Sequence, residues 1–161
     1  MVVILMGVSG AGKTTVGRKL AAALGWTFYE GDDLHAAANV EKMSRGISLT
    51  DEDRRPWLLA LRKLIEGCLQ REEDAVVTCS ALKRTYREVL KDGDADVVFV
   101  YLKADPRQAG ERLERRLGHF AKGNLLESQF ATLEEPSPEE ALAVDASKRP
   151  EEIVEEVRRN L

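Results

Sequence analysis

The feature that most constrains this chain is a glycine-rich stretch close to its start. Residues 7–14 read Gly-Val-Ser-Gly-Ala-Gly-Lys-Thr and fill every fixed position of the phosphate-binding pattern G-x-x-x-x-G-K-[ST]. An apolar run of β type, residues 2–6, leads into this stretch, and a helical pattern follows it. Such a loop turns its backbone N–H groups toward an anion, and the helix start adds positive potential. The sequence therefore predicts a nucleotide phosphate site and the P-loop NTPase fold.

The side chains of the loop suggest separate roles on a bound nucleotide. Lys13 supplies a mobile charge to the β- and γ-phosphates, and the Thr14 hydroxyl suits a Mg²⁺ ion that bridges them. The expected cofactors are therefore ATP and Mg²⁺. The expected nucleotide-binding residues of the loop are Gly7, Val8, Ser9, Gly10, Ala11, Gly12, Lys13, Thr14 and Thr15.

Strand and helix patterns alternate along the rest of the chain. This alternation predicts an α/β fold with a parallel sheet and helices on both faces. Residues 50–53 fit a capping box that opens a long helix, in which Pro56 either starts the regular part or causes a kink. The pattern weakens over residues 117–138, which predicts a mobile excursion. The expected strands are residues 2–6, 26–29, 75–79, 97–102 and 142–145.

Length and charge narrow the class of protein further. A chain of 161 residues with 43% hydrophobic residues is expected to form a single domain, residues 1–161. Its net charge of −4 argues against general affinity for nucleic acids or membranes. Cys68 and Cys79 lack C-x-x-C spacing, and residues 2–6 are too short for a signal peptide or membrane span. We therefore expect a cytoplasmic protein with reduced thiols.

Several separate blocks of the sequence resemble the gluconokinase family. The resemblance implies ATP-dependent phosphorylation of D-gluconate to 6-phospho-D-gluconate, a five-stranded sheet of order 2-3-1-4-5, and a mobile lid at about residues 117–138. Two positions depart from the family pattern, since Glu30 stands where aspartate is usual and Ala36 where proline is frequent. The blocks are Gly31-Asp32-Asp33-Leu34-His35, Leu49-Thr50-Asp51-Glu52-Asp53-Arg54-Arg55-Pro56-Trp57-Leu58, Cys79-Ser80-Ala81-Leu82-Lys83 with Tyr86-Arg87, and Gly118-His119-Phe120 with Gln129-Phe130.

Candidate residues for the acceptor site follow the second and third strands. Asp32, at the end of the second strand, is the expected catalytic carboxylate, which orients the attacking hydroxyl and accepts its proton. Asp33 ranks below it as a helix cap. His35 is expected to bond a substrate hydroxyl. The candidate cations for a sugar-acid carboxylate are Arg54, Lys83 and Arg87, of which Lys83 is favoured because small residues beside it leave room for substrate.

The late basic segment resembles the lid of small-molecule kinases. Arg116 is the expected catalytic cation of this segment, and Arg112 shares its helix face. The expected catalytic residues of the chain are therefore Lys13, Asp32 and Arg116. His119 is assigned to the substrate. The resemblance places adenine near residues 147–150, and it assigns the metal to Thr14 and to Glu30, either directly or through water.

Three other functions compete with this interpretation. A shikimate-kinase-like enzyme would share the loop and the acidic second-strand end, although it leaves the other blocks unexplained. An ATP-binding switch without transfer activity is disfavoured by the intact Lys13, Thr14 and Asp32. A nucleic-acid 5′-kinase is disfavoured because the chain has no basic stripe with aromatic residues. The expected partner is the small-molecule substrate, with a homodimer as one assembly.

Overall fold

The computed structural model describes residues 1–117 and 121–161, and its strands form one parallel sheet. The order across the sheet is β2-β3-β1-β4-β5, which confirms the expected order. Because all four neighbouring pairs run parallel, the carboxyl ends of the strands lie along one edge. The strands are β1 (Val2–Met6), β2 (Thr27–Glu30), β3 (Ala75–Thr78), β4 (Val97–Lys103) and β5 (Ala141–Asp145).

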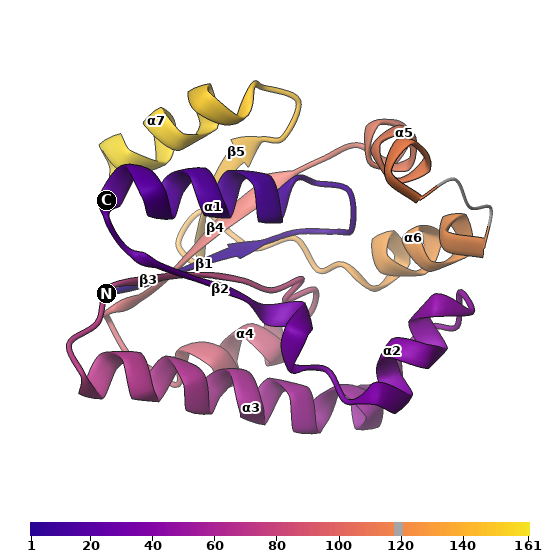
Figure 1. Cartoon of the computed structure of the whole chain (residues 1–161), viewed down its shortest axis with the longest axis horizontal. Helices are drawn as coiled ribbons and strands as arrows, with labels where there is room; N and C mark the ends of the chain where they lie inside the picture. The colour runs from indigo at the N-terminus through magenta and orange to yellow at the C-terminus, as the bar shows by residue number, and fades with distance from the viewer. Residues whose placement is uncertain (118–120) are drawn as a thin grey trace.

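Helices cover both faces of this sheet, as the alternating pattern predicted. Helices α1 and α7 lie over one face, and α3 and α4 lie over the other (Figure 1). The helices are α1 (Lys13–Leu24), the 3₁₀ helix η1 (Gly31–Leu34), α2 (Ala37–Ser44), α3 (Asp51–Gln70), α4 (Arg84–Lys91), α5 (Pro106–Leu117), α6 (Ala121–Thr132) and α7 (Pro150–Asn160).

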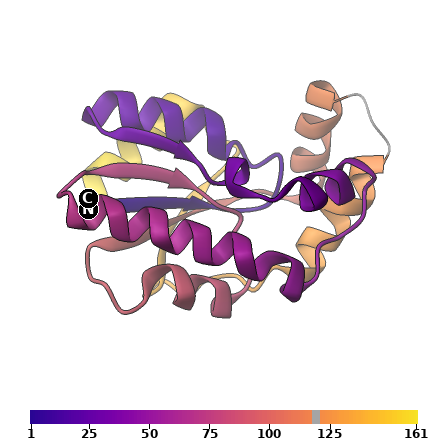
Figure 2. The ribbon, with the colours of Figure 1, turned by 60° about the horizontal axis from the view of Figure 1, so that its bottom comes forward.

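The central strand β1 shows why its sequence is apolar without alternation. Val3 and Leu5 pack into the core formed with α1 and α7. Ile4 packs into the opposite core, formed with α3 and α4. Figure 2 shows the sheet between these two layers. A strand buried on both faces can expose no polar side chain, so every residue of β1 is apolar.

The sequence predicted the start of helix α3 but did not predict helix α6. The capping box at α3 is confirmed, because Thr50 Oγ1 accepts the Asp53 N–H at 3.0 Å and Asp53 Oδ2 accepts the Thr50 N–H at 3.0 Å. Pro56 lies inside α3, so it does not start the helix. Helix α6 corrects the expectation for residues 117–138, because the weak pattern there predicted a mobile excursion and no helix. Its apolar anchors are few, with Leu126 buried and Phe130 partly buried.

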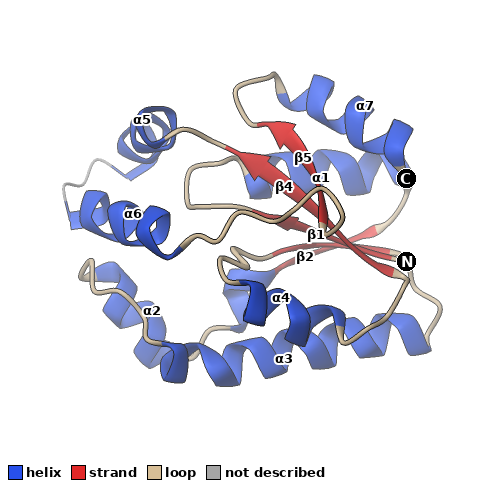
Figure 3. Cartoon of the chain, turned by 180° about the vertical axis from the view of Figure 1, so that it is seen from behind, coloured by secondary structure: helices blue, strands red, loops and turns tan. Residues whose placement is uncertain are grey.

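Three helices lie beyond the carboxyl edge of the sheet. Helices α2, α5 and α6 lie beyond this edge, whereas both chain termini lie at the other end (Figures 1 and 3). None of the described helices has the length and apolar character needed to cross a bilayer. In parallel α/β sheets ligands collect at the carboxyl edge, and the predicted site residues follow β1, β2 and β3 there.

Candidate active site

The phosphate-binding loop joins β1 to α1 along a path that requires glycine. Gly7 and Gly10 have positive φ values of 147° and 82°. A Cβ atom on Gly10 would lie 2.5 Å from the carbonyl oxygen of Ala109, and one on Gly7 would lie 2.9 Å from that of Leu102. The loop is therefore pressed against α5 and the end of β4, where larger residues would displace it.

Lys13, the first residue of α1, folds back over this loop. Its Nζ donates to the carbonyl oxygens of Gly7 at 2.8 Å and Val8 at 2.9 Å. Burial lowers the pKa of the Lys13 amine, while the nearby carboxylate of Asp32 acts in the opposite direction. Both hydrogen-bond partners are neutral, so the ammonium charge is available to an anion that enters the loop.

The carboxylate of Glu30 is fixed by two threonines from neighbouring elements. Thr14 Oγ1 donates to Glu30 Oε2 at 2.6 Å, and Thr78 Oγ1 donates to Oε1 of the same carboxylate. Thr78 also accepts the N–H of Gly31 at 3.1 Å. Because β3 lies between β2 and β1, Glu30 must reach across β3 to meet Thr14. Thr78 was not predicted as a site residue, although a polar residue that ends the apolar strand β3 was the available signal.

Asp32 is placed by the tight start of η1. A Cβ atom on Gly31 would lie 1.9 Å from the carbonyl oxygen of Thr78, so only glycine lets η1 approach β3 this closely. The Trp57 indole N–H donates to the Gly31 carbonyl at 2.8 Å and anchors the same turn. Asp32 and Asp33 are both exposed, but only Asp32 is among the groups whose charge acts on Lys13.

His35 stacks on Trp57 just beyond η1. The ring centroids are 4.2 Å apart and the planes differ by 13°. The Nδ1 atom of His35 is buried and has no hydrogen-bond partner among the described residues. Buried polar atoms are normally satisfied, so this nitrogen is a candidate contact for a substrate hydroxyl, and the substrate role of His35 stays a prediction.

The environment of His35 predicts a pH dependence of stability. Burial lowers the pKa of His35 below its ordinary 6.5, with Asp32 opposing the shift and Arg54 adding to it. The unfolded chain then binds this proton more readily, so the free energy of unfolding decreases as the pH falls below about 6.5. In His35→Asn this contribution is absent. Urea unfolding at pH 7.5 and 5.5 should show a smaller acid loss in the variant, and an equal loss would contradict the assignment.

Two of the predicted substrate cations converge on Tyr86, which faces α3 from α4. Lys83 Nζ forms an ion pair with Asp51 at 2.9 Å, and the Tyr86 hydroxyl also bonds this carboxylate. Arg54 donates to the Tyr86 hydroxyl at 3.1 Å, and its guanidinium lies 5.6 Å from the ring centroid. Lys83 thus already has an acidic partner, whereas the described hydrogen bond of Arg54 goes to a neutral oxygen.

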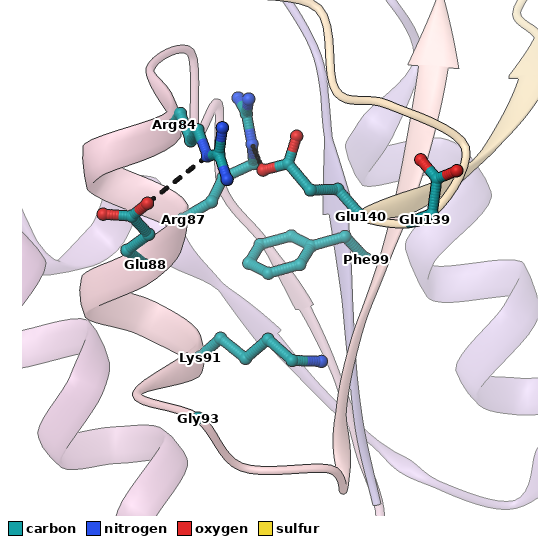
Figure 4. A pocket seen from close by; sticks show the side chains of 8 residues that line it. All are labelled: Arg84, Arg87, Glu88, Lys91, Gly93, Phe99, Glu139 and Glu140. Carbon is teal, nitrogen blue, oxygen red and sulfur yellow. Dashed lines mark hydrogen bonds and ion pairs between the residues drawn. The ribbon is translucent and has the colours of Figure 1, made fainter.

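The third predicted cation, Arg87, is engaged with its own fold. Its side chain is only 3% exposed, pairs with Glu140 at 3.2 Å and donates to the carbonyl oxygen of Ala81 at 2.8 Å. Figure 4 shows Arg87 pointing toward Glu140 beside a cavity of about 270 Å³ floored by Phe99. Of the other cations that line the cavity, Arg84 pairs with Glu88 and Lys91 donates to the carbonyl oxygen of Val97 at 2.8 Å. The structure therefore does not bring Arg87 together with Arg54 and Lys83.

Loss of Arg87 should destabilise the protein. Arg87→Met leaves Glu140 and the Ala81 carbonyl without a donor, and breaking a buried pair costs roughly 3 kcal/mol when one partner is partly exposed. The free energy of unfolding, measured in urea, should fall by about this amount. The double variant with Glu140→Gln should recover part of the loss. A fully stable Arg87→Met protein with weakened substrate binding would instead return Arg87 to the substrate site.

The lid arginines lie beside the phosphate-binding loop. Arg112 donates to the carbonyl oxygens of Ala11 at 3.0 Å and Ala146 at 2.6 Å, and so joins the loop to the segment after β5. With Arg116, it lines a cavity of about 270 Å³. Gly10, Gly12, Thr15 and Lys148 line the same cavity. The loop and three cations, Arg112, Arg116 and Lys148, therefore face one space at the carboxyl edge. His119 lies outside the described residues.

A glutamine that was not predicted as a site residue also contacts the loop. Gln129 Oε1 accepts the backbone N–H of Ser9 at 2.7 Å, and Gln129 Nε2 donates to the Ser9 hydroxyl at 2.9 Å. This contact connects α6 to a residue 120 positions away in the sequence. Sequence periodicity carried no signal for such a long-range pair.

The amino-acid sequence of this chain is similar to a known domain family and to known enzymes. A family model described as an AAA domain matches residues 2–136. The gluconokinase of Gluconobacter oxydans is 48% identical over 158 residues, which cover 98% of this chain and 89% of that protein. The thermosensitive gluconokinase of Escherichia coli is 47% identical over 137 residues, 85% of this chain and 73% of that one.

Solved structures agree with these relatives. The crystal structure of a gluconokinase from Sinorhizobium meliloti superimposes with a TM-score of 0.85 at 45% identity and covers 96% of this chain and 87% of that one. A shikimate kinase from Acinetobacter baumannii superimposes with a TM-score of 0.63 at 19% identity and covers 99% and 91% of the two chains. The second likeness concerns the fold alone.

Proposed function

This chain belongs to the gluconokinase family, and on that premise we propose how its residues transfer the γ-phosphoryl group of ATP to D-gluconate. The product is 6-phospho-D-gluconate. Transfer occurs in one in-line step, without a covalent intermediate on the enzyme. Such a reaction requires chiefly positioning and charge stabilisation, and each candidate residue has a role of that kind.

The observation that carries this proposal is the joint position of Lys13 and Asp32 at the carboxyl edge. Asp32 lies close enough to Lys13 for its charge to act on the amine. Lys13 neutralises charge on the γ-phosphoryl group as it leaves ADP. Asp32 orients the 6-hydroxyl of gluconate and accepts its proton as the new P–O bond forms. The proposed base and the cation of the phosphate site thus lie near each other.

The donor set around Thr14 fits a magnesium ion. Mg²⁺ prefers oxygen ligands and keeps several waters alongside phosphate oxygens. Thr14 and the Glu30 carboxylate, held in place by Thr78, offer such oxygens. Among the described residues, no cluster of three or more His, Cys, Asp or Glu side chains could hold a metal by itself. The ion would therefore enter with the nucleotide, and it would neutralise phosphate charge during transfer.

For the carboxylate of gluconate, the contacts favour Arg54 over Lys83. Lys83 would have to exchange Asp51 for the substrate, whereas Arg54 would only add a bidentate partner to its bond with Tyr86. His35 completes this acceptor site through its buried Nδ1, which would bond a hydroxyl. Arg54 therefore becomes the proposed carboxylate ligand, and Lys83 supports it by holding Asp51 and Tyr86.

The nucleotide would extend from the loop into the cavity beside Arg112 and Arg116. Arg116 is the proposed cation for the transferring phosphoryl group, and residues 147–150 would border adenine. We further propose, on the family resemblance, that residues 117–138 act as a lid and that His119 contacts the substrate.

The protein is further proposed to be cytoplasmic and to form a homodimer. The net charge of −4 supports the absence of nucleic-acid partners.

Detection of 6-phosphogluconate tests the proposed phosphorylation of gluconate. Purified protein with Mg²⁺, ATP and gluconate should form ADP and 6-phosphogluconate in equal amounts, followed by separate coupled assays. An ATP-binding switch would release no ADP that depends on gluconate. A kinase with another acceptor would release ADP with that acceptor and form no 6-phosphogluconate.

A further inference from the structure

Helix α6 occupies a position between the two substrate sites. It packs against α5, which carries Arg112, and against α2, which follows the acceptor residues of η1. Figures 1 and 3 both show α6 between these helices, beyond the carboxyl edge of the sheet. Residues 125–132 belong to the proposed lid, but none of them was given a contact to either substrate above, so the polar contacts of this stretch need their own explanation.

The first contact joins α6 to the phosphate-binding loop. The amide of Gln129 is held at both ends by Ser9, since Oε1 accepts the backbone N–H at 2.7 Å and Nε2 donates to the hydroxyl at 2.9 Å. Two simultaneous bonds fix the orientation of the amide. Ser9 lies in the loop whose backbone donors face the phosphates, and so Gln129 fixes the loop at the point where a γ-phosphate would arrive.

The second contact joins α6 to the acceptor side. The adjacent residue, Ser128, hydrogen-bonds through its hydroxyl to the hydroxyl of Ser48 at 2.6 Å. Ser48 lies in the segment between α2 and α3, two residues before the Thr50 cap. The helix that Thr50 caps carries Arg54 within its first turns. One turn of α6 is therefore bonded to both the nucleotide loop and the segment that leads to the carboxylate ligand.

We propose that Gln129 is a positioning residue for phosphoryl transfer, and that α6, through Gln129 and Ser128, couples the binding of nucleotide to the binding of gluconate. A nucleotide that orders the loop also orders α6 through Gln129. The segment around Ser48 then loses less conformational freedom when gluconate binds, because its partner helix is already fixed. The coupling is positive, and by linkage gluconate strengthens nucleotide binding by the same factor.

Calorimetry on the intact protein measures this coupling directly. Gluconate is titrated into the protein alone and into protein saturated with Mg²⁺ and a non-hydrolysable ATP analogue. The ratio of the two Kd values is the coupling factor, which we expect to be at least about fivefold in the unmodified protein. Gln129→Met keeps the length and helix propensity of the side chain but removes both bonds, and it should bring the factor to within about twofold of one.

Two further variants separate coupling from a general disturbance of α6. Ser128→Ala breaks the bond at the other end and should lower the factor as Gln129→Met does. Glu127→Met changes an exposed residue on the same helix and should leave the factor unchanged. Because the factor is a ratio, a uniform loss of gluconate affinity cancels.

The proposed coupling rests on the proposed function, and different results would contradict each of them. If gluconate gives no binding heat and no product, the proposed function fails and the inference falls with it. If gluconate binds and is phosphorylated but the unmodified protein shows a factor near one, or Gln129→Met retains the full factor, the coupling role is overturned and the kinase assignment stands.

Discussion

Replacement of Lys13 by methionine is expected to reduce kcat by about 10³-fold, which is the upper range for loss of one preorganised charge at a transferring group. Lys13 is the cation of the loop itself, and its two described partners are neutral carbonyls. Its charge is therefore free to act on the γ-phosphoryl group. Methionine retains the length and apolar stem of the side chain, so the loop should keep its path.

The stability of Lys13→Met should change little, since the cost of holding a buried amine offsets the two lost hydrogen bonds. Steady-state kinetics and thermal melting measure both properties on one preparation. Lys19→Met is the matched control, because Lys19 lies on the same helix in an exposed ion pair with Glu151. If Lys13→Met kept kcat within tenfold of the unmodified protein, the proposed charge stabilisation would be wrong.

Replacement of Asp32 by asparagine should lower kcat by about 10²–10⁴-fold, the usual effect of removing a general base. Asparagine preserves the size of the side chain and can orient a hydroxyl, but it cannot accept the proton at neutral pH. The KM for ATP should change little, because the loop and Lys13 remain intact.

Asp33 provides the control for this experiment. It is the next residue of η1 and is also exposed, and Asp33→Asn changes the local charge by the same amount. We expect Asp33→Asn to keep kcat within a few-fold of the unmodified protein. If both variants lost activity equally, the effect would come from local charge rather than from a base at Asp32.

The sequence was sufficient where a function depends on a local pattern. The loop at residues 7–14, the strands around it and the capping box at Thr50 are each encoded by neighbouring residues, and the structure confirms the predicted elements. The acidic turn after β2 could be found in the same way, since the carboxyl ends of parallel strands share one edge. Sheet order came from the family resemblance, because alternation alone does not specify it.

The sequence was insufficient where a side chain's role depends on a distant partner. Lys83 was favoured for the substrate carboxylate, but its ion pair with Asp51 arises only when α3 packs beside α4. Arg87 is held by Glu140, 53 positions away. The contact between Gln129 and Ser9 comes from a helix whose weak periodicity hid it. Such pairings are set by tertiary packing, which leaves no trace in local spacing.

The most direct test of the central claim is the kcat/KM of the unmodified protein for four acceptors with Mg²⁺ and ATP. The acceptors are gluconate, shikimate, glucose and glycerate, and ADP release is followed for each. A site with an arginine for the carboxylate and a histidine for a hydroxyl should prefer gluconate over glucose, which lacks the carboxylate, by at least about 10²-fold. A preference for shikimate, glucose or glycerate over gluconate would contradict the account of the acceptor site.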